Sequence, residues 1–134
     1  MSTRRTFLKE SAVVLSVLAL SKPSLSFASP CKCAGIVYTK ENPGKWVKKV
    51  SSHIPIVTLE GEKVTVETKH GMSPAHFIVR HTLVLEDGTV VGAKTFSAND
   101  KPISTYALPA GYKGTVYATS FCNLHDLWLS EITI

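Results

Sequence analysis

The sequence predicts an all-β fold, an antiparallel β-sandwich of about seven short strands. Three observations support this prediction. β-Branched residues recur in short runs, apolar and polar residues alternate within those runs, and turn residues such as glycine and proline separate them. After residue 28, no segment shows a sustained helical period. Many short strands with frequent turns are typical of two antiparallel sheets that pack face to face.

The strands are expected as two hairpins followed by two later strands. The first hairpin turns around Gly61, because Val64 and Val66 alternate with polar residues just after it. The second turns at Gly88, after the longest candidate strand. Residues 97–111 include two prolines and are expected to form a loop with at most one short strand. The expected strands cover residues 54–59, 63–68, 77–85, 89–96, 113–121 and 127–134.

The first 28 residues have the features of an export signal. Arg4 and Arg5 precede an apolar run, residues 12–20, which is far shorter than the roughly twenty residues of a membrane span. Small residues up to Ala28 mark a cleavage position. The paired arginines resemble a twin-arginine signal, which implies a periplasmic protein. An uncleaved signal that stays as an anchor is the alternative. The expected order is a signal peptide, an N-terminal segment and one domain, over residues 1–28, 29–44 and 45–134.

The composition limits the classes of partner. The chain has 134 residues, of which 44% are hydrophobic and 19% charged, and this is ordinary for a globular protein. Its formal net charge is +5, but the basic residues are scattered and no aromatic residues are interleaved with them. We therefore expect no nucleic-acid binding. We also expect no stable membrane insertion after the signal is removed.

Four of the five histidines and one late cysteine lie where loops or strand edges are expected. His70 and His76 flank a stretch that contains glycine and proline. Cys122 and His125 form a Cys-x-x-His pair between two expected strands, and His53 stands at the start of a strand. A sandwich gathers its loops at its two ends, so these side chains could converge on one point.

Each of these residues, taken alone, has a simpler explanation. A single loop histidine is usually solvated, and a single late cysteine is usually a small core residue. His81 differs from the other histidines because it falls within the alternating pattern of residues 77–85. We expect His81 to be a packed or rim residue rather than a ligand.

Read with their neighbours, the same residues carry a family resemblance. The segments are His53-Ile54-Pro55, His70-Gly71-Met72 followed by His76-Phe77-Ile78, and Cys122-Asn123-Leu124-His125-Asp126-Leu127-Trp128. In this order and approximate spacing, they resemble the ligand signature of the superoxide reductases, the ferrous-iron domain shared by desulfoferrodoxins and neelaredoxins. The resemblance covers roughly residues 45–134. It implies a seven-stranded immunoglobulin-like sandwich.

The resemblance also implies one iron per chain, which cycles between Fe(2+) and Fe(3+). By position, the ligands are the imidazoles of His53, His70, His76 and His125 and the thiolate of Cys122. Five protein ligands leave one position open for superoxide, which takes one electron and becomes hydrogen peroxide. The implied partners are superoxide and an electron-donor protein. A structural zinc site is the alternative, but zinc usually takes four ligands and fits five candidates poorly.

One departure from the family bears on activity. Typical members place Glu-Lys directly before the first histidine ligand, where this chain has Ser51 and Ser52. Lys48 and Lys49 lie close upstream, and we expect either to attract superoxide by charge. A solvated lysine pair is the alternative. A non-catalytic iron or electron-transfer protein of the same fold is therefore the second hypothesis, and a binding module with incidental histidines is the third.

The second departure is a Cys-Lys-Cys motif near the mature N-terminus. Some family members carry an N-terminal iron centre with four cysteines, which Cys31 and Cys33 cannot build within a single chain. In an oxidising compartment the two thiols could pair between chains or stay as exposed redox thiols. The sequence leaves the role of this motif open, and it leaves a homo-oligomer open as well.

Overall fold

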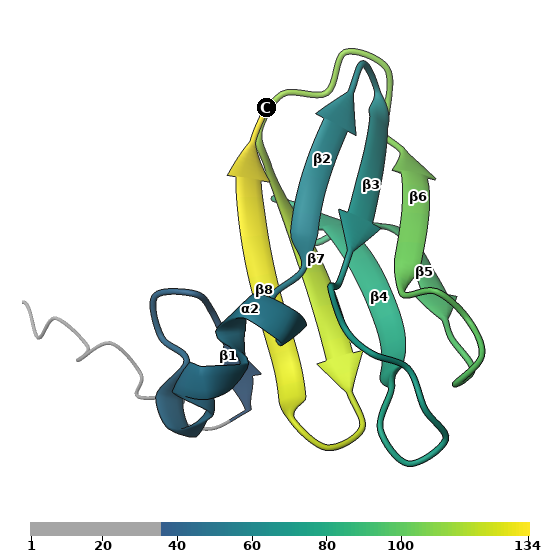
Figure 1. The fold of residues 1–134 in the computed structure, drawn as a ribbon. Helices are drawn as coiled ribbons and strands as arrows, with labels where there is room; N and C mark the ends of the chain where they lie inside the picture. The colour runs from purple at the N-terminus through teal and green to yellow at the C-terminus, as the bar shows by residue number, and fades with distance from the viewer. Residues whose placement is uncertain (1–35) are drawn as a thin grey trace, which may run out of the picture. The chain divides into compact units, whose positions relative to one another are not determined.

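The computed structural model describes residues 36–134, so the predicted signal peptide, Cys31 and Cys33 lie outside the described residues. The described chain forms two β-sheets (Figure 1). One sheet has five strands in the order β1-β8-β7-β4-β5, and the other has three in the order β2-β3-β6. The predicted all-β sandwich is confirmed. The strands are β1 (Val37–Tyr38), β2 (Ile56–Glu60), β3 (Lys63–Glu67), β4 (Ile78–Leu85), β5 (Val90–Thr95), β6 (Ile103–Ala107), β7 (Thr115–Cys122) and β8 (Asp126–Thr133).

The strand pairing follows the predicted hairpins. β2 and β3 pair around Gly61, whose φ of 62° is one that glycine adopts without strain. β4 and β5 pair around Gly88, which has a φ of 87°. β6 is the one short strand within residues 97–111, and it pairs with β3. β1 is an addition, because a strand of two residues is too short to show an alternating pattern. It runs parallel to β8, whereas the other pairs are antiparallel.

Two short helical segments precede β2, and they correct the prediction for His53. A 3₁₀-helix, η2 (Gly44–Lys49), leads into a single turn of α-helix, α2 (Val50–His53). His53 therefore ends a helix and does not start a strand. One turn is too short to show a helical period, and it stops here because Ile54 precedes Pro55 and is extended. Among residues 36–134, no helix has the length and apolar character needed to cross a membrane.

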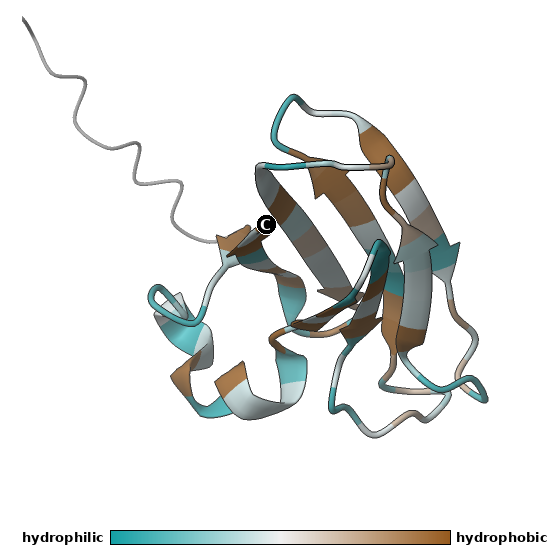
Figure 2. Cartoon of the chain, turned by 90° about the horizontal axis from the view of Figure 1, so that it is seen from above, coloured by the Kyte–Doolittle hydropathy of each residue, from teal (hydrophilic) through white to brown (hydrophobic). Residues whose placement is uncertain are grey.

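The core lies between the two sheets and has two parts. Buried and partly exposed residues alternate along β3, β4 and β7, and Figure 2 shows hydrophobic and hydrophilic bands along the strands. A second, smaller cluster joins Ile78, Phe96 and Cys122, with Met72 packed against it. Cys122 is thus part of the core as well as a candidate ligand. The larger cluster consists of Val64, Val66, Leu83, Leu85, Leu108, Val116 and Ala118.

His81 is fully buried between the sheets, as the alternating pattern predicts. Its Nε2 lies 2.9 Å from Thr68 Oγ1, and its Nδ1 lies 2.9 Å from Ser104 Oγ. Thr68 Oγ1 in turn lies 2.8 Å from Ser120 Oγ. His81 and Ser120 belong to the five-stranded sheet, whereas Ser104 belongs to the three-stranded one. This polar chain therefore ties the two sheets together through the core.

Candidate metal centre

Three segments that are distant in the sequence meet at one end of the sandwich (Figure 1). They are the end of α2, the loop between β3 and β4, and the turn between β7 and β8. The sequence could not show how closely they approach, because their contacts are entirely tertiary. In chain order, these segments carry His53, His70, His76, Cys122 and His125.

The ring nitrogens of the four histidines face one another at short distances. His53 Nε2 and His76 Nε2 each lie 3.0 Å from His125 Nδ1. His70 Nε2 lies 3.0 Å from His76 Nε2. Adjacent rings have centroids 4.4–4.7 Å apart and are inclined to one another by 69–89°. The rings therefore surround a common point, in the order His53, His70, His76, His125.

This spacing fits a metal ion. A square with sides of 3.0 Å has corners about 2.1 Å from its centre, and about 2.1 Å is the usual length of a metal–imidazole bond. The donor atoms of His53, His70, His76 and Cys122 all lie within 4.8 Å of one another. His125 completes this group through its two 3.0 Å contacts. We refer to these five residues as the His₄Cys cluster.

The sulfur of the cluster comes from a buried cysteine. Cys122 is 1% exposed, and its Sγ lies 3.6 Å from His125 Nδ1. It is the last residue of β7, so it lies at a strand end and not in the loop that the sequence suggested. A soft thiolate beside several imidazoles is a donor set that suits iron, copper or zinc and not magnesium or calcium.

Three imidazoles of the cluster, those of His53, His70 and His125, have lowered pKa values that favour their neutral form. Burial, with the nearby His70 ring as the next cause, lowers the pKa of His53 to about 4. Burial also lowers the pKa values of His70 and His125, and the His76 ring adds to both shifts. Histidine must be neutral to bind a metal through a ring nitrogen. At neutral pH these rings are therefore ready to act as ligands.

A tight turn directs Cys122 and His125 to the same side. Cys122 pairs with Asp126 across the β7–β8 ladder, which leaves three residues to reverse the chain. Asp126 has a φ of 66°, a left-handed conformation that closes turns of this length and that aspartate tolerates better than most residues. Its carboxylate accepts a hydrogen bond of 2.8 Å from Trp46 Nε1. The Trp46 ring in turn packs edge-on against His125, with centroids 4.6 Å apart.

Asn123 joins this turn to the loop that carries His76. Its Nδ2 donates to the Ala75 carbonyl at 3.0 Å, and its Oδ1 accepts from the Phe77 N–H at 3.0 Å. Its own N–H donates to the Phe77 carbonyl at 3.2 Å. One residue thus bonds to both neighbours of His76 while it stands next to Cys122.

The lysines and serines before His53 have different surroundings. Lys49 is half-buried, and its charge adds to the burial that lowers the pKa values of His70 and His125. Lys48 is exposed. Ser51 is also exposed, whereas Ser52 is half-buried and its Oγ lies 2.8 Å from His53 Nδ1.

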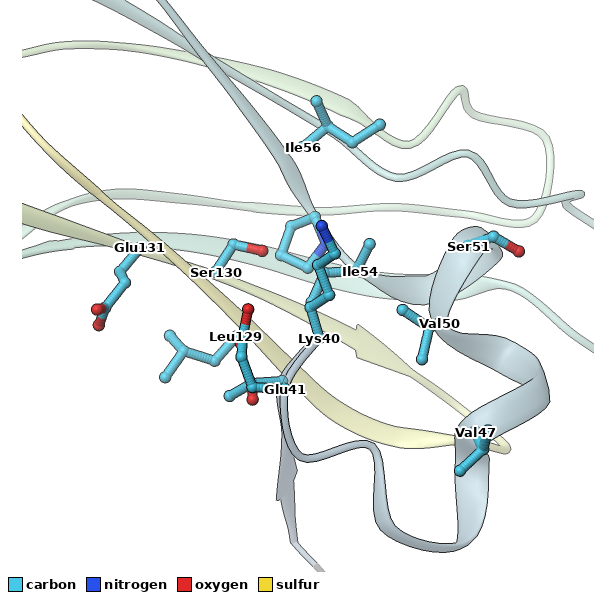
Figure 3. Close-up of a pocket in the computed structure, with 12 residues that line it drawn as sticks. Lys40, Glu41, Val47, Val50, Ser51, Ile54, Ile56, Leu129, Ser130 and Glu131 are labelled. Atoms are coloured by element: carbon cyan, nitrogen blue, oxygen red, sulfur yellow. The ribbon is translucent and has the colours of Figure 1, made fainter.

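A groove of about 960 Å³ lies beside this helical region (Figure 3). Val47, Val50 and Ile54 line it together with residues of β8, and none of the five cluster residues does. The groove is therefore separate from the His₄Cys cluster. Helix α2 contributes Val50 and Ser51 to the groove and His53 to the cluster.

Comparison with known proteins places this arrangement in a family. The sequence profile of the family described as Desulfoferrodoxin matches residues 45–131, which include the whole His₄Cys cluster. The chain belongs to the desulfoferrodoxin family. The superoxide reductases of Pyrococcus abyssi and Thermococcus kodakarensis are each 32% identical to it over 108 residues, which cover 68% of this chain and 92% of theirs.

A solved structure supports the same relationship for the fold of this desulfoferrodoxin-family chain. A single-residue variant of the superoxide reductase (neelaredoxin) from Ignicoccus hospitalis superposes with a TM-score of 0.66 at 27% sequence identity. The match covers 73% of this chain and 92% of that one. The sandwich formed by residues 36–134 is therefore that of a desulfoferrodoxin-type domain.

Several residues around the cluster were not identified as functional from the sequence. Trp46 stands between Lys45 and Val47, in a segment whose lysines alone were interpreted as functional. Asn123 lies inside the Cys-x-x-His motif. A short polar residue between two candidate ligands indicates a side chain that could hydrogen-bond near the metal site. Ser52 was noticed only as a departure from the family pattern. The structure gives each of them a direct contact to a cluster residue or its neighbours.

Proposed function

We propose that this chain is a superoxide reductase, an oxidoreductase that converts superoxide to hydrogen peroxide with one electron and two protons, the protons coming from solvent. The observation that carries the proposal is the His₄Cys cluster, in which four imidazoles and one buried thiol surround a common point. The relatives named superoxide reductase support it, since they match the chain over nearly their whole length.

The cluster would hold one iron per chain. When bound, iron supplies reversible one-electron chemistry between its ferrous and ferric states, which the side chains of this site do not offer. The four neutral imidazoles suit ferrous iron, and the Cys122 thiolate donates electron density to it. Five donors exceed the four that a structural zinc site takes, which favours iron over zinc. An electron-donor protein is then required, because each turnover consumes one electron.

Lys49 supplies the charge that attracts superoxide. Its backbone carbonyl lies 3.1 Å from His53 Nδ1, and its positive charge contributes to the lowered pKa values of His70 and His125. Superoxide is an anion, and a positive potential at the entrance of a site raises its encounter rate. Lys48, the neighbouring candidate, is exposed, so water and salt screen its charge more strongly.

The decisive test of this function is the stoichiometry of the reaction. Reduced protein is mixed rapidly with superoxide under anaerobic conditions, and hydrogen peroxide and oxygen are both measured. We expect one hydrogen peroxide for each superoxide and no release of oxygen, because the protein supplies the electron. Sluggish oxidation with no peroxide would instead identify an iron-binding or electron-transfer protein. Release of oxygen would identify a dismutase.

The two lysines allow a matched test of steering. Lys49→Ala should lower the second-order rate with superoxide by about tenfold at low salt and flatten its dependence on ionic strength, because a nearby charge is screened by salt. Lys48→Ala should change the rate by less than about twofold, since an exposed charge is already screened. Equal rates in all three proteins would remove Lys49 from the mechanism.

We also propose that the protein works in the periplasm. The support is the paired Arg4 and Arg5, the short apolar run and the small residues up to Ala28. Fractionation of cells that express the full chain tests this. The mature protein should be found in the periplasmic fraction, and replacement of both arginines with lysine should retain the protein inside the cell. Unchanged export by that variant would exclude a twin-arginine signal.

A further inference from the structure

Ser52 directly precedes His53, and its hydroxyl is in contact with this cluster residue. Ser52 Oγ lies 2.8 Å from His53 Nδ1 and 3.2 Å from the Lys49 carbonyl oxygen. His53 Nδ1 is itself 3.1 Å from the same carbonyl. These contacts follow from helical geometry, because the carbonyl of residue 49 faces residues three and four positions later.

The direction of these hydrogen bonds is fixed by the carbonyl. A carbonyl oxygen only accepts, so the Ser52 hydroxyl donates to Lys49, and its lone pairs are left to accept from His53. His53 Nδ1 must then carry the proton, whether it donates to Ser52 or to the Lys49 carbonyl. The lone pair of the ring is therefore on Nε2, which lies 3.0 Å from His125 Nδ1 in the cluster.

We propose that Ser52 is a positioning residue, whose hydroxyl fixes the tautomer and the ring orientation of His53 so that Nε2 points into the His₄Cys cluster. This inference rests on the proposed function, because it assigns Ser52 a role towards the metal held there. A histidine ligand is commonly held by a hydrogen bond from its second ring nitrogen, and loss of that partner typically lowers metal affinity by 10–100-fold.

The proposal also explains why a serine and a lysine are not equivalent here. A lysine ammonium has three donors and no lone pair, so it cannot accept the Nδ1 proton of a neighbouring histidine. Serine has both a donor and acceptors, and it can stand between His53 and the Lys49 carbonyl. Ser52 carries no charge and instead orients the His53 ring. The positive charge that acts on the cluster histidines comes from Lys49.

Three variants test the proposal by metal release. Ser52→Ala removes the hydroxyl, Ser52→Thr keeps it, and Ser51→Ala is the matched control on the exposed neighbour. Alanine is a better helix former than serine, so truncation does not weaken α2. The ferrous protein is mixed anaerobically with excess chromogenic chelator, and the rate of iron release is followed by absorbance.

We expect Ser52→Ala to release iron about tenfold faster than the unmodified protein, at the lower end of the usual range because the Lys49 carbonyl remains as an acceptor. Ser52→Thr and Ser51→Ala should release it at the original rate. A nitrogen–proton correlation spectrum of the metal-free protein should show His53 protonated at Nδ1. In Ser52→Ala a minor Nε2–H population should appear, because the Lys49 carbonyl alone still favours Nδ1–H, whereas a histidine side chain in water favours Nε2–H.

Three results overturn the inference. The first is equal iron release from Ser52→Ala and Ser51→Ala, and the second is His53 protonated at Nε2 in the unmodified metal-free protein. The third is release from Ser52→Thr as fast as from Ser52→Ala, which would show that packing at this position matters and the hydroxyl does not. None of these results affects the proposed function, which fails separately if the unmodified protein contains no iron after anaerobic purification.

Discussion

Asn123 shows at the scale of a single residue how two distant segments are held in register. Its side chain and backbone make three hydrogen bonds to Ala75 and Phe77, the residues on either side of His76. The same residue follows Cys122 directly, so it fixes the position of a histidine relative to the thiol. The candidate ligands themselves could be predicted from local motifs, because each motif contains its ligand. The bonds of Asn123 could not, since they depend on a loop that lies 46 residues or more away in the chain.

Replacement of Asn123 should therefore loosen the cluster more than it destabilises the fold. For Asn123→Ala we expect faster iron release and a decrease of about 1 kcal/mol in the free energy of unfolding, because the bonds are exposed and each contributes little. Asn99→Ala removes an exposed amide that is not among the contacts of the cluster residues, and it is the control. Chelator competition and urea denaturation give the two quantities. Identical iron release from both variants would contradict the role of Asn123.

At the scale of the elements, the β7–β8 turn and the single turn α2 decide where the ligands point. The sequence predicted the flanking strands because each has several alternating residues. It missed α2, because four residues cannot show a helical period, and it therefore placed His53 at the start of a strand. The sequence predicted a connection between β7 and β8. It did not predict that this turn has three residues, because that length depends on the left-handed conformation of Asp126, and no sequence pattern indicates that conformation.

The left-handed conformation gives a prediction for Asp126. Both Asp126→Ala and Asp126→Gly remove the carboxylate that binds Trp46 and lies 3.4 Å from Lys45 Nζ. Only alanine is strained at a φ of 66°, so Asp126→Ala should be less stable than Asp126→Gly by about 1 kcal/mol. Thermal or urea unfolding of the two variants measures this difference. Equal stability would mean that the turn relaxes to another conformation when aspartate is removed.

At the scale of the whole molecule, buried polar groups link the two sheets and make stability depend on pH. Burial lowers the pKa of His81 to about 4, and the charge of Lys94 contributes to the shift. The Thr68 and Ser104 hydroxyls contact the ring nitrogens, and the Ser120 hydroxyl contacts that of Thr68. The sequence predicted that His81 is packed, since it follows the alternation of its strand. It could not predict the hydroxyl partners, because they come from three other segments of the chain.

His81 binds a proton more weakly in the folded state than in the unfolded state, where its pKa is about 6.5. Its neutral form therefore favours folding fully above pH 6.5, and that contribution is lost as the pH falls from about 6.5 to 4. The loss is up to about 3 kcal/mol, since one pKa unit corresponds to about 1.4 kcal/mol. Urea unfolding at pH 7.5, 6 and 5 measures this loss. Between pH 7.5 and 5, the free energy of unfolding should fall less for His81→Gln than for the unmodified protein. Parallel curves for the two proteins would exclude His81, because the cluster histidines are common to both.

The central claim is that four imidazoles and one thiolate bind a single iron. X-ray absorption at the iron edge of the anaerobically purified protein tests it most directly, because this measurement counts the nitrogen and sulfur neighbours of the metal. The structure predicts four imidazole nitrogens and one sulfur around iron, and the sulfur should be lost in Cys122→Ser. A spectrum without sulfur in the unmodified protein, or with only one or two imidazoles, would contradict the claim.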